Sequence, residues 1–112
     1  MQLWIRVHEK HYANGSVSRV LAVCDEELLG SVFRGAHSVI DLKKYASFYK
    51  GELVSEARAV ELIGGGRACA DNLNLVGDRS LAAARKALKL NGSSVKRVAG
   101  VPHLQVFHVR VR

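Results

Sequence analysis

The fold of this chain is decided by the stretch LWIRVHEKHYANGSVSRVLAVC, residues 3–24. Apolar side chains occupy every second position of residues 3–7, which is the period of a half-buried β-strand. Asn14-Gly15 follows, a strong signal for a two-residue hairpin turn because both positions favour positive φ. Residues 17–24 supply an apolar returning strand, so the chain is predicted to open with an antiparallel hairpin.

The middle of the chain carries shorter patterns. Residues 25–30 read as one helical turn that Asp25 caps and Gly30 ends. Residues 37–42 are typical of a short strand, and residues 43–53 are expected to be irregular. This part of the sequence therefore predicts connecting structure between the opening hairpin and the helices that follow.

Two helices are predicted in the second half. The first runs from Ser55 to about Ile63 and ends at three glycines, residues 64–66. With Arg67 these glycines suit a helix end better than a phosphate loop, because a phosphate loop normally precedes its helix. The second helix spans about 79–90, begins at Asp78 as its N-cap and has an apolar stripe of helical period.

The last elements complete a mixed fold. Residues 68–76 favour a strand or a loop, and 95–99 and 104–111 favour strands around a turn at residues 100–103. Hairpins at both ends with helices between them predict an α+β fold, a two-layer α/β sandwich with a largely antiparallel sheet and helices on one face. With 112 residues and no visible linker or repeat, the chain is expected to be a single domain, residues 1–112.

The composition favours a cytoplasmic protein. No window reaches the roughly 18 uninterrupted apolar residues of a membrane helix. Residues 1–8 carry charge and imidazole where a signal peptide has its apolar segment. The two cysteines, Cys24 and Cys69, are too few for a disulfide framework and have apolar neighbours, so both are expected to fill the core.

The net charge of +7 is carried by the last part of the chain. Residues 1–66 hold eight basic and eight acidic side chains, whereas residues 67–112 hold nine basic ones against Asp71 and Asp78. Such an excess favours polyanionic partners, with the outer side of the 79–90 helix as the main contact surface; the alternative is merely a soluble, heat-adapted surface. The residues predicted to bind nucleic acid are Arg67, Arg79, Arg85, Lys86, Lys89, Lys96 and Arg97.

A second group of cations lies among aromatic rings. Lys43-Lys44-Tyr45 and Phe48-Tyr49-Lys50 interleave lysines with rings, an arrangement suited to single-stranded nucleic acid because rings stack on bases while lysines follow the backbone. The alternative is that the three rings, spaced i, i+3 and i+4, pack an irregular turn onto the core.

Three motifs together resemble a known family. They are CDEELLG at residues 24–30, NLVGD at residues 74–78 before a helix, and GVPH at residues 100–103 before the last strand. Over nearly its whole length the chain resembles a small archaeal family of uncharacterised proteins, a conserved domain of unknown function. The resemblance implies an α+β two-layer sandwich and a cytoplasmic archaeal source. It implies no activity, so no catalytic residue is carried over.

The family-like motifs define a candidate site of Asp25, Gly100, Pro102 and His103. We expect Asp25 and the turn at residues 100–103 to lie close together. His103 with Asp25, Cys24 and His108 has the chemistry of a metal site or an acid–base pair, although nothing in their spacing brings them together. The alternative is a structural histidine bonded to the turn at residues 24–25. No metal ligand, cofactor or catalytic residue is assigned.

The leading hypothesis from the sequence is a non-enzymatic RNA-binding or ribonucleoprotein-associated module, because the whole charge excess lies in residues 67–112. One alternative is a protein-interaction or homo-oligomeric module that uses an exposed strand edge of a hairpin. The other is a small metal- or ligand-dependent enzyme centred on His103 and Asp25. RNA or a ribonucleoprotein is therefore the expected partner.

Overall fold

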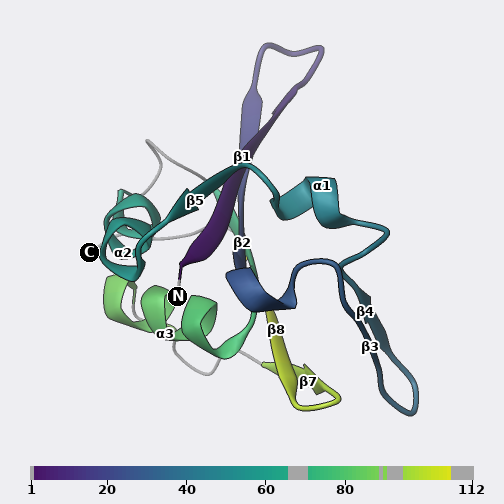
Figure 1. The fold of residues 1–112 in the computed structure, drawn as a ribbon. Coiled ribbons are helices and arrows are strands. Elements are labelled where there is room, and N and C mark those ends of the chain that lie inside the picture. The colour runs from purple at the N-terminus through teal and green to yellow at the C-terminus, as the bar shows by residue number, and fades with distance from the viewer. Residues whose placement is uncertain (1, 66–70, 89, 91–94, 107–112) are drawn as a thin grey trace.

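The computed structural model describes residues 2–65, 71–88, 90 and 95–106 of the chain (Figure 1). In these residues a six-stranded sheet has the strand order β5-β1-β2-β6-β8-β7, and a two-stranded sheet pairs β3 with β4. In chain order the elements are β1 Leu3–His11, β2 Val17–Asp25, the 3-10 helix η1 Glu26–Leu28, β3 Val32–Arg34, β4 Val39–Asp41, α1 Ala46–Tyr49, β5 Glu52–Val54, α2 Glu56–Gly64, β6 Asn72–Val76, α3 Asp78–Ala87, β7 Lys96–Val98 and β8 Val101–Val106.

The predicted α+β fold with a largely antiparallel sheet is confirmed. In the large sheet β2 and β6 are parallel, whereas the other neighbouring strands run antiparallel. None of the helices in the described ranges is long and apolar enough to cross a membrane.

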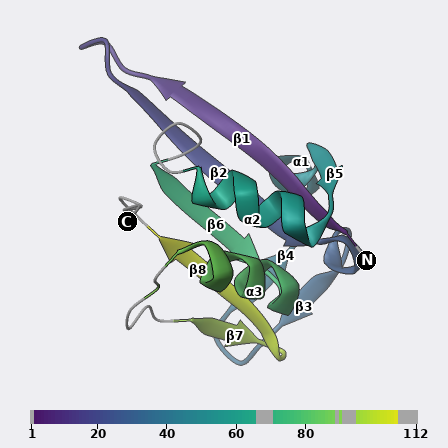
Figure 2. The same cartoon turned by 90° about the vertical axis from the view of Figure 1, so that its left-hand side faces the viewer.

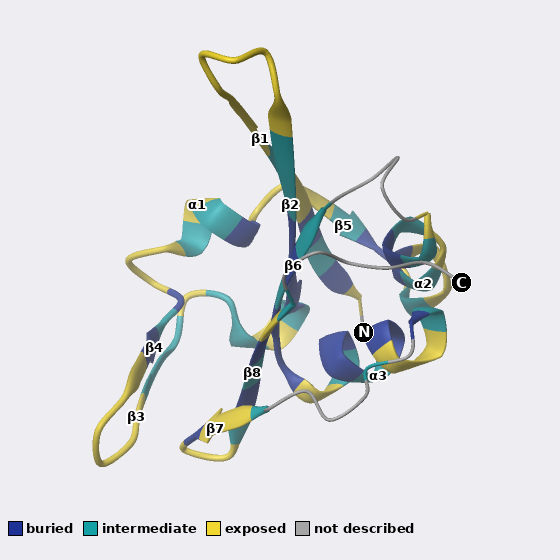
Figure 3. Ribbon diagram, turned by 180° about the vertical axis from the view of Figure 1, so that it is seen from behind, coloured by how far each residue is buried: buried dark blue, intermediate teal, exposed yellow. Residues whose placement is uncertain are grey.

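The opening hairpin forms as predicted, but its connection spans residues 12–16, and of the Asn14-Gly15 pair only Gly15 has positive φ. Its turn is closed by the N–H of Gly15, which donates to Tyr12 O at 2.9 Å, and Gly15 has a φ of +88° that glycine adopts without strain. β1 pairs with β5 only over Leu3–Ile5, and β2 pairs with β6 over Val20–Cys24. The outer half of the hairpin therefore extends beyond the sheet, where Figures 1 and 3 show it projecting and exposed.

One face of the large sheet is covered by α2 and α3, which pack side by side (Figure 2). The core between these layers is apolar and almost fully buried. Each large aliphatic side chain buried there contributes about 1.5–3 kcal/mol relative to leaving it exposed. The buried members of this core are Leu3, Ile5, Leu21, Val23, Val54, Ala59, Ile63, Leu73, Leu75, Leu81, Ala83, Ala84, Leu88 and Leu104.

The opposite face is covered in part by η1, the β3–β4 arm and α1 (Figure 3). A second, smaller core lies there, made by Ala22, Cys24, Ile40, Leu42, Tyr49, Val76 and Val98. The two long helices lie on one face as expected, and the short helix α1 adds cover on the other.

Residues 43–53 differ from the prediction of irregular structure. They contain α1 and β5, and β5 pairs with the beginning of β1. Residues 52–54 show no strand pattern of their own, and β5 obtains its hydrogen bonds from β1, more than 40 positions away in the sequence.

Helix boundaries depart from prediction in two places. Ser55 caps α2 as expected, its hydroxyl accepting from Arg58 N at 3.1 Å. However, α3 ends at Ala87 rather than near residue 90, because Leu88 is extended with a φ of −135°. The turn predicted at residues 100–103 lies at Ala99-Gly100, both with positive φ, so that Pro102 and His103 belong to β8.

Candidate functional site

In the described strands of the large sheet, the register places no acidic side chain on one of the two faces. Residues directly opposite each other in neighbouring strands lie on the same face. Cross-strand pairing therefore aligns one row of side chains, Trp4, Cys24, Val76, His103 and Lys96, and a parallel row, Arg6, Ala22, Asn74 and Gln105. Both rows lie on the face opposite α2 and α3.

We call this surface the acid-free face. Every Asp and Glu within the described strands of the large sheet, namely Glu9, Asp25 and Glu52, has a register position on the other face. Basic side chains on the acid-free face come from β1 and β7, at Arg6, Lys10 and Lys96. The face is defined by the strand residues Trp4, Arg6, His8, Lys10, Ser18, Val20, Ala22, Cys24, Leu53, Asn72, Asn74, Val76, Lys96, Val98, Val101, His103 and Gln105.

Cations lie beside aromatic rings along its border. Lys44 Nζ is 5.4 Å from the centroid of the Tyr45 ring, and Lys50 Nζ is 5.9 Å from the centroid of Trp4. These contacts are within the range of cation–π attraction.

The three rings of residues 45–49 separate into two roles. Tyr49 is 6% exposed, and Phe48 stacks on His8 with a centroid distance of 4.3 Å. Those two rings pack against the sheet, as the alternative interpretation predicted. Tyr45 is 56% exposed and remains on the surface.

A small polar network lies on this face beneath α1. Asn74 Oδ1 accepts from the Tyr49 hydroxyl at 2.9 Å and from His103 Nε2 at 3.2 Å. Because a carbonyl oxygen only accepts, Nε2 carries the imidazole proton and Nδ1 keeps its lone pair. Burial lowers the pKa of His103, and Lys96 nearby lowers it further, so the ring is neutral at pH 7. Burial also raises the pKa of Tyr49, which therefore remains a donor.

A pocket of about 360 Å³ opens beside this network. One wall comes from β4 and the segment after it, residues 39–42 with Lys44, Tyr45 and Tyr49. The other wall is the sheet itself, at Val76 and His103. The pocket thus lies where the β3–β4 arm and α1 meet the acid-free face.

On the other face, Asp25 caps α3 from a neighbouring strand. Parallel pairing of Cys24 with Val76 places Asp25 beside Gly77. The buried carboxylate accepts from Arg79 N at 3.1 Å, Ser80 N at 2.8 Å and Ser80 Oγ at 2.7 Å. It thereby satisfies N–H groups at the first turn of α3 and complements the positive end of the helix dipole.

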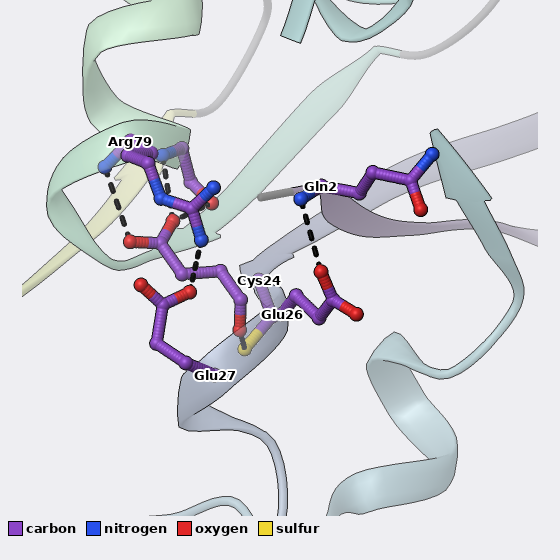
Figure 4. Close-up of polar contacts among 7 residues, drawn as sticks. Gln2, Cys24, Glu26, Glu27 and Arg79 are labelled. Carbon is purple, nitrogen blue, oxygen red and sulfur yellow. Dashed lines mark hydrogen bonds and ion pairs between the residues drawn. The ribbon is translucent and has the colours of Figure 1, made fainter. Parts of the chain in front are cut away.

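Two predicted caps are corrected by this arrangement. Asp25 makes no cap hydrogen bond to η1, and the N-cap of α3 is Gly77 rather than Asp78. Gly77 is required there because its φ is +111° and a Cβ at this position would overlap the Asp25 carboxylate. Figure 4 shows Arg79 reaching Glu27 in the same junction, next to Cys24 and the contact of Gln2 with Glu26.

Comparison with known proteins places the chain among proteins without an assigned activity. Residues 12–109 match the family described as "Protein of unknown function (DUF424)". The chain belongs to this family. The DUF424 match covers most of the chain and confirms the resemblance to a domain of unknown function.

The crystal structure of an uncharacterized conserved protein from Methanopyrus kandleri has a similar fold. The two chains share 20% sequence identity and a TM-score of 0.78, over 100% of this DUF424 chain and 96% of the other. At this identity the similarity shows the fold alone. No curated protein matches the chain.

The candidate site from the family-like motifs divides between the two faces. Gly77 N donates to Pro102 O at 3.0 Å, so Asp25 and Pro102 both contact Gly77. Gly100 O accepts from Arg97 Nη1 at 3.0 Å in the same region. The side chain of His103, however, lies on the acid-free face, where it contacts Asn74.

His103 and Asp25 therefore do not form the shared site on which the enzyme hypothesis was centred. The sheet separates the two side chains, and the carboxylate is already engaged by the start of α3. Within the described residues, no group of three or more His, Cys, Asp or Glu side chains gathers as a metal site would require. Cys24 is fully buried, and burial, with Asp25 and Glu27 adding to it, raises its pKa to about 12. Cys69 and His108 lie outside the described residues.

Three of the residues predicted to bind nucleic acid form ion pairs with acids from other elements in the described part of the DUF424 chain. Arg79 pairs with Glu27, Lys86 with Glu56 at 3.0 Å, and Arg97 with Asp78 at 3.3 Å. Arg85 is exposed on α3, and Lys96 is exposed on the acid-free face. Arg67 and Lys89 lie outside the described residues.

Sequence reasoning missed Arg6, Asn74 and Gln105 as members of one surface. The alternation along β1 placed Trp4, Arg6 and His8 on one side of a strand, and that signal was available. Which strands lie beside β1, and in which register, depends on pairing between distant segments. Periodicity within one segment does not contain this information.

Proposed function

We propose that this protein binds single-stranded RNA through the acid-free face. The observation that carries the proposal is the distribution of charge over the large sheet. In the described strands of the large sheet every acidic residue has a register position on the other face, whereas Arg6, Lys10 and Lys96 share this one with polar and aromatic side chains. Within the described strands of the large sheet, no acid on this face repels a phosphate from these cations. Asp41 of β4, on the arm that covers part of the face, lines the pocket there.

The side chains between these cations favour a single strand over a duplex. The amides of Asn74 and Gln105 are cross-strand neighbours, and Gln105 is exposed. The exposed Gln105 amide and exposed rings such as Tyr45 can contact base edges and base faces, which a single strand offers and a duplex conceals. The proposal therefore moves the interface from the outer side of α3 to the opposite side of the molecule.

A binding assay with two matched double variants tests the proposal. Lys44→Glu/Lys96→Glu reverses two charges at the acid-free face, and Arg58→Glu/Arg85→Glu reverses two exposed charges on α2 and α3. Both lower the net charge by the same amount. Affinity for a fluorescent single-stranded RNA of about ten nucleotides is measured by anisotropy at low salt, with thermal melting as the control for folding.

We expect the face variant to bind at least about tenfold more weakly, while the helix variant retains most of the affinity. Equal losses in both variants would mean that only total charge matters. A larger loss of affinity in the helix variant would indicate that the interface lies on α3. Absence of binding by the wild-type protein at low salt would end the proposal.

The outer hairpin supports a second candidate function, self-association or binding of another protein. Val7, Tyr12 and Val17 are 49%, 45% and 38% exposed there. In the described chain β1 beyond Ile5 pairs with no strand other than β2, and such an edge can add a strand. Light scattering after size-exclusion chromatography tests self-association. A wild-type dimer that becomes monomeric in the Val7→Lys/Val17→Lys variant would support it. A wild-type protein that stays monomeric at high concentration would contradict it.

A further inference from the structure

We propose that the pocket beside Tyr45 and His103 receives one unstacked base of the bound RNA, and that it prefers a base with an exocyclic amino group. The inference rests on the proposed RNA-binding function and names the ligand of one site within it. It follows from the size of the pocket, the nature of its walls and the hydrogen-bonding groups that line it.

The dimensions of the pocket suit one small ring system. Its volume of about 360 Å³ lies at the low end of the range for small-molecule sites, roughly 300–1,000 Å³. Apolar side chains from β4 form one wall, at Val39 and Ile40, and Val76 lies on the sheet side. Such walls favour a flat apolar group over a charged one.

An exposed ring with a cation above it stands among the lining residues. Tyr45 is 56% exposed, so one side of its ring is available for stacking. Lys44, also exposed, holds its ammonium 5.4 Å from the centre of that ring. A base stacked on Tyr45 would therefore bring its phosphate near a positive charge.

The remaining polar groups of the pocket accept hydrogen bonds. His103 donates through Nε2 to Asn74, which leaves Nδ1 as an acceptor. Asp41 Oδ1 already accepts from Lys43 N at 3.1 Å and Lys44 N at 2.7 Å, so the second carboxylate oxygen is the one left for a ligand. Two acceptors match a donor-bearing edge, as in adenine, cytosine and guanine; uracil has no exocyclic amino group.

The carboxylate also sets the orientation of the ligand. Asp41 repels a phosphate from the part of the pocket that it lines, while Lys44 attracts one. The base is therefore expected inside and the phosphate at Lys44. A free phosphate or a ribose phosphate, which has no base to stack, is expected to leave the inner wall unaffected.

Nucleoside monophosphates test the pocket without any RNA. Backbone amide shifts of Leu42, Val76 and His103 are followed by NMR during titration with AMP, CMP, GMP, UMP and ribose 5-phosphate. We expect the three amino-bearing nucleotides to move these signals more than UMP, and ribose 5-phosphate to leave them unchanged. Equal shifts with ribose 5-phosphate, or none with any nucleotide, would overturn the inference.

RNA affinity of ring variants supplies the second measurement. Tyr45→Ala is expected to weaken binding of an adenine-rich single strand about tenfold, because base–aromatic stacking is lost, and Tyr45→Phe is expected to retain it. Tyr12→Ala is the matched control, since Tyr12 is also exposed, at 45%, but lies in the hairpin turn.

The two measurements separate failure of the pocket from failure of the proposed function. If the Tyr45→Ala variant binds RNA as tightly as the wild-type protein does, the inference about the pocket is wrong and the proposed RNA-binding face stands. If wild-type protein does not bind RNA, the proposed function is wrong, and the monophosphate titration alone decides whether the pocket takes a base.

Discussion

Asp25 is the residue on which the junction of β2, β6 and α3 depends. The residue is 4% exposed, and its carboxylate accepts from two backbone N–H groups of α3 and from the Ser80 hydroxyl. Asp25→Ala leaves these donors without their acceptor. An unsatisfied buried group lowers the stability by about 1–3 kcal/mol, and a lost helix cap lowers it by about 1 kcal/mol. We expect the free energy of unfolding in urea to fall by about 2–4 kcal/mol, and Asp25→Asn, which keeps one acceptor, to lose less.

Gly77 is coupled to Asp25 and can be tested by a double-mutant cycle. A Cβ at Gly77 would overlap the Asp25 carboxylate, and the φ of +111° adds strain for any other residue. Gly77→Ala should therefore destabilise the wild-type protein more than it destabilises the Asp25→Ala variant, where the overlap is removed. Urea unfolding of the four proteins measures the coupling, and strictly additive losses would contradict the contact.

His103 predicts a pH dependence of stability with a definite sign. Burial and Lys96 lower the pKa of His103 in the folded protein. When the pH falls below the unfolded pKa of about 6.5, the unfolded chain binds a proton that the folded chain takes up only at lower pH. Stability is therefore lost as the pH falls from about 6.5 towards the folded pKa, and none is lost above that window.

Lys96→Gln should raise the pKa of His103 and reduce this acid-side loss. An NMR titration of the imidazole and urea unfolding at pH 7 and pH 5 measure both effects. His103→Gln serves as the control because it removes the titrating group while four other histidines remain. A His103 pKa that does not respond to Lys96→Gln would show that burial alone sets it.

At the scale of elements, the approach of α1 and β5 to β1 depends on Gly51. A Cβ there would collide with Ile5 O and lie 2.8 Å from Arg6 Cβ. Gly51→Ala should lower the melting temperature, at a cost of about 1–3 kcal/mol for overpacking, and shift amide signals of α1. Gly64→Ala is the control: its Cβ would meet Ala87 Cβ at 3.7 Å, so this helical position should become slightly more stable.

Element prediction succeeded where the signal was local. The Asn14-Gly15 turn specifies its hairpin, and Ser55 caps α2, because the groups that interact lie within four residues of each other. It failed for β3, β5 and α1, which are three or four residues long and gain stability from partners elsewhere. The cap of α3 was assigned to Asp78 for the same reason: a local acid was available, and the actual acceptor, Asp25, comes from another strand.

At the scale of the whole molecule, the proposed interface predicts the salt dependence of RNA binding. Each neutralised phosphate of a single strand adds about 0.7 to the slope of log affinity against log salt. If Lys44 and Lys96 each contact a phosphate, Lys44→Glu/Lys96→Glu should lower the slope by about 1.4. Arg58→Glu/Arg85→Glu should leave it nearly unchanged in anisotropy titrations between 50 and 200 mM salt, and a reversed order would contradict the assignment of the face.

The class of fold, the opening hairpin, the two long helices and the net charge were predictable from the amino-acid sequence alone. These follow from the alternation of side chains, the turn residues and the composition, all of which act within a few positions of the chain. The sequence also placed the excess of cations in residues 67–112.

Which charges lie near one another depends on contacts between distant segments of the chain. Three cations predicted to form the interface pair with acids from other elements, Glu27, Glu56 and Asp78. The acid-free face instead combines β1, from the nearly neutral first half, with β7 and β8 from the basic end. Strand neighbours and register are fixed because two apolar cores must be buried on opposite faces of one sheet. This requirement involves the whole chain, so the residues next to Arg6 or Lys96 in the sequence do not reveal it.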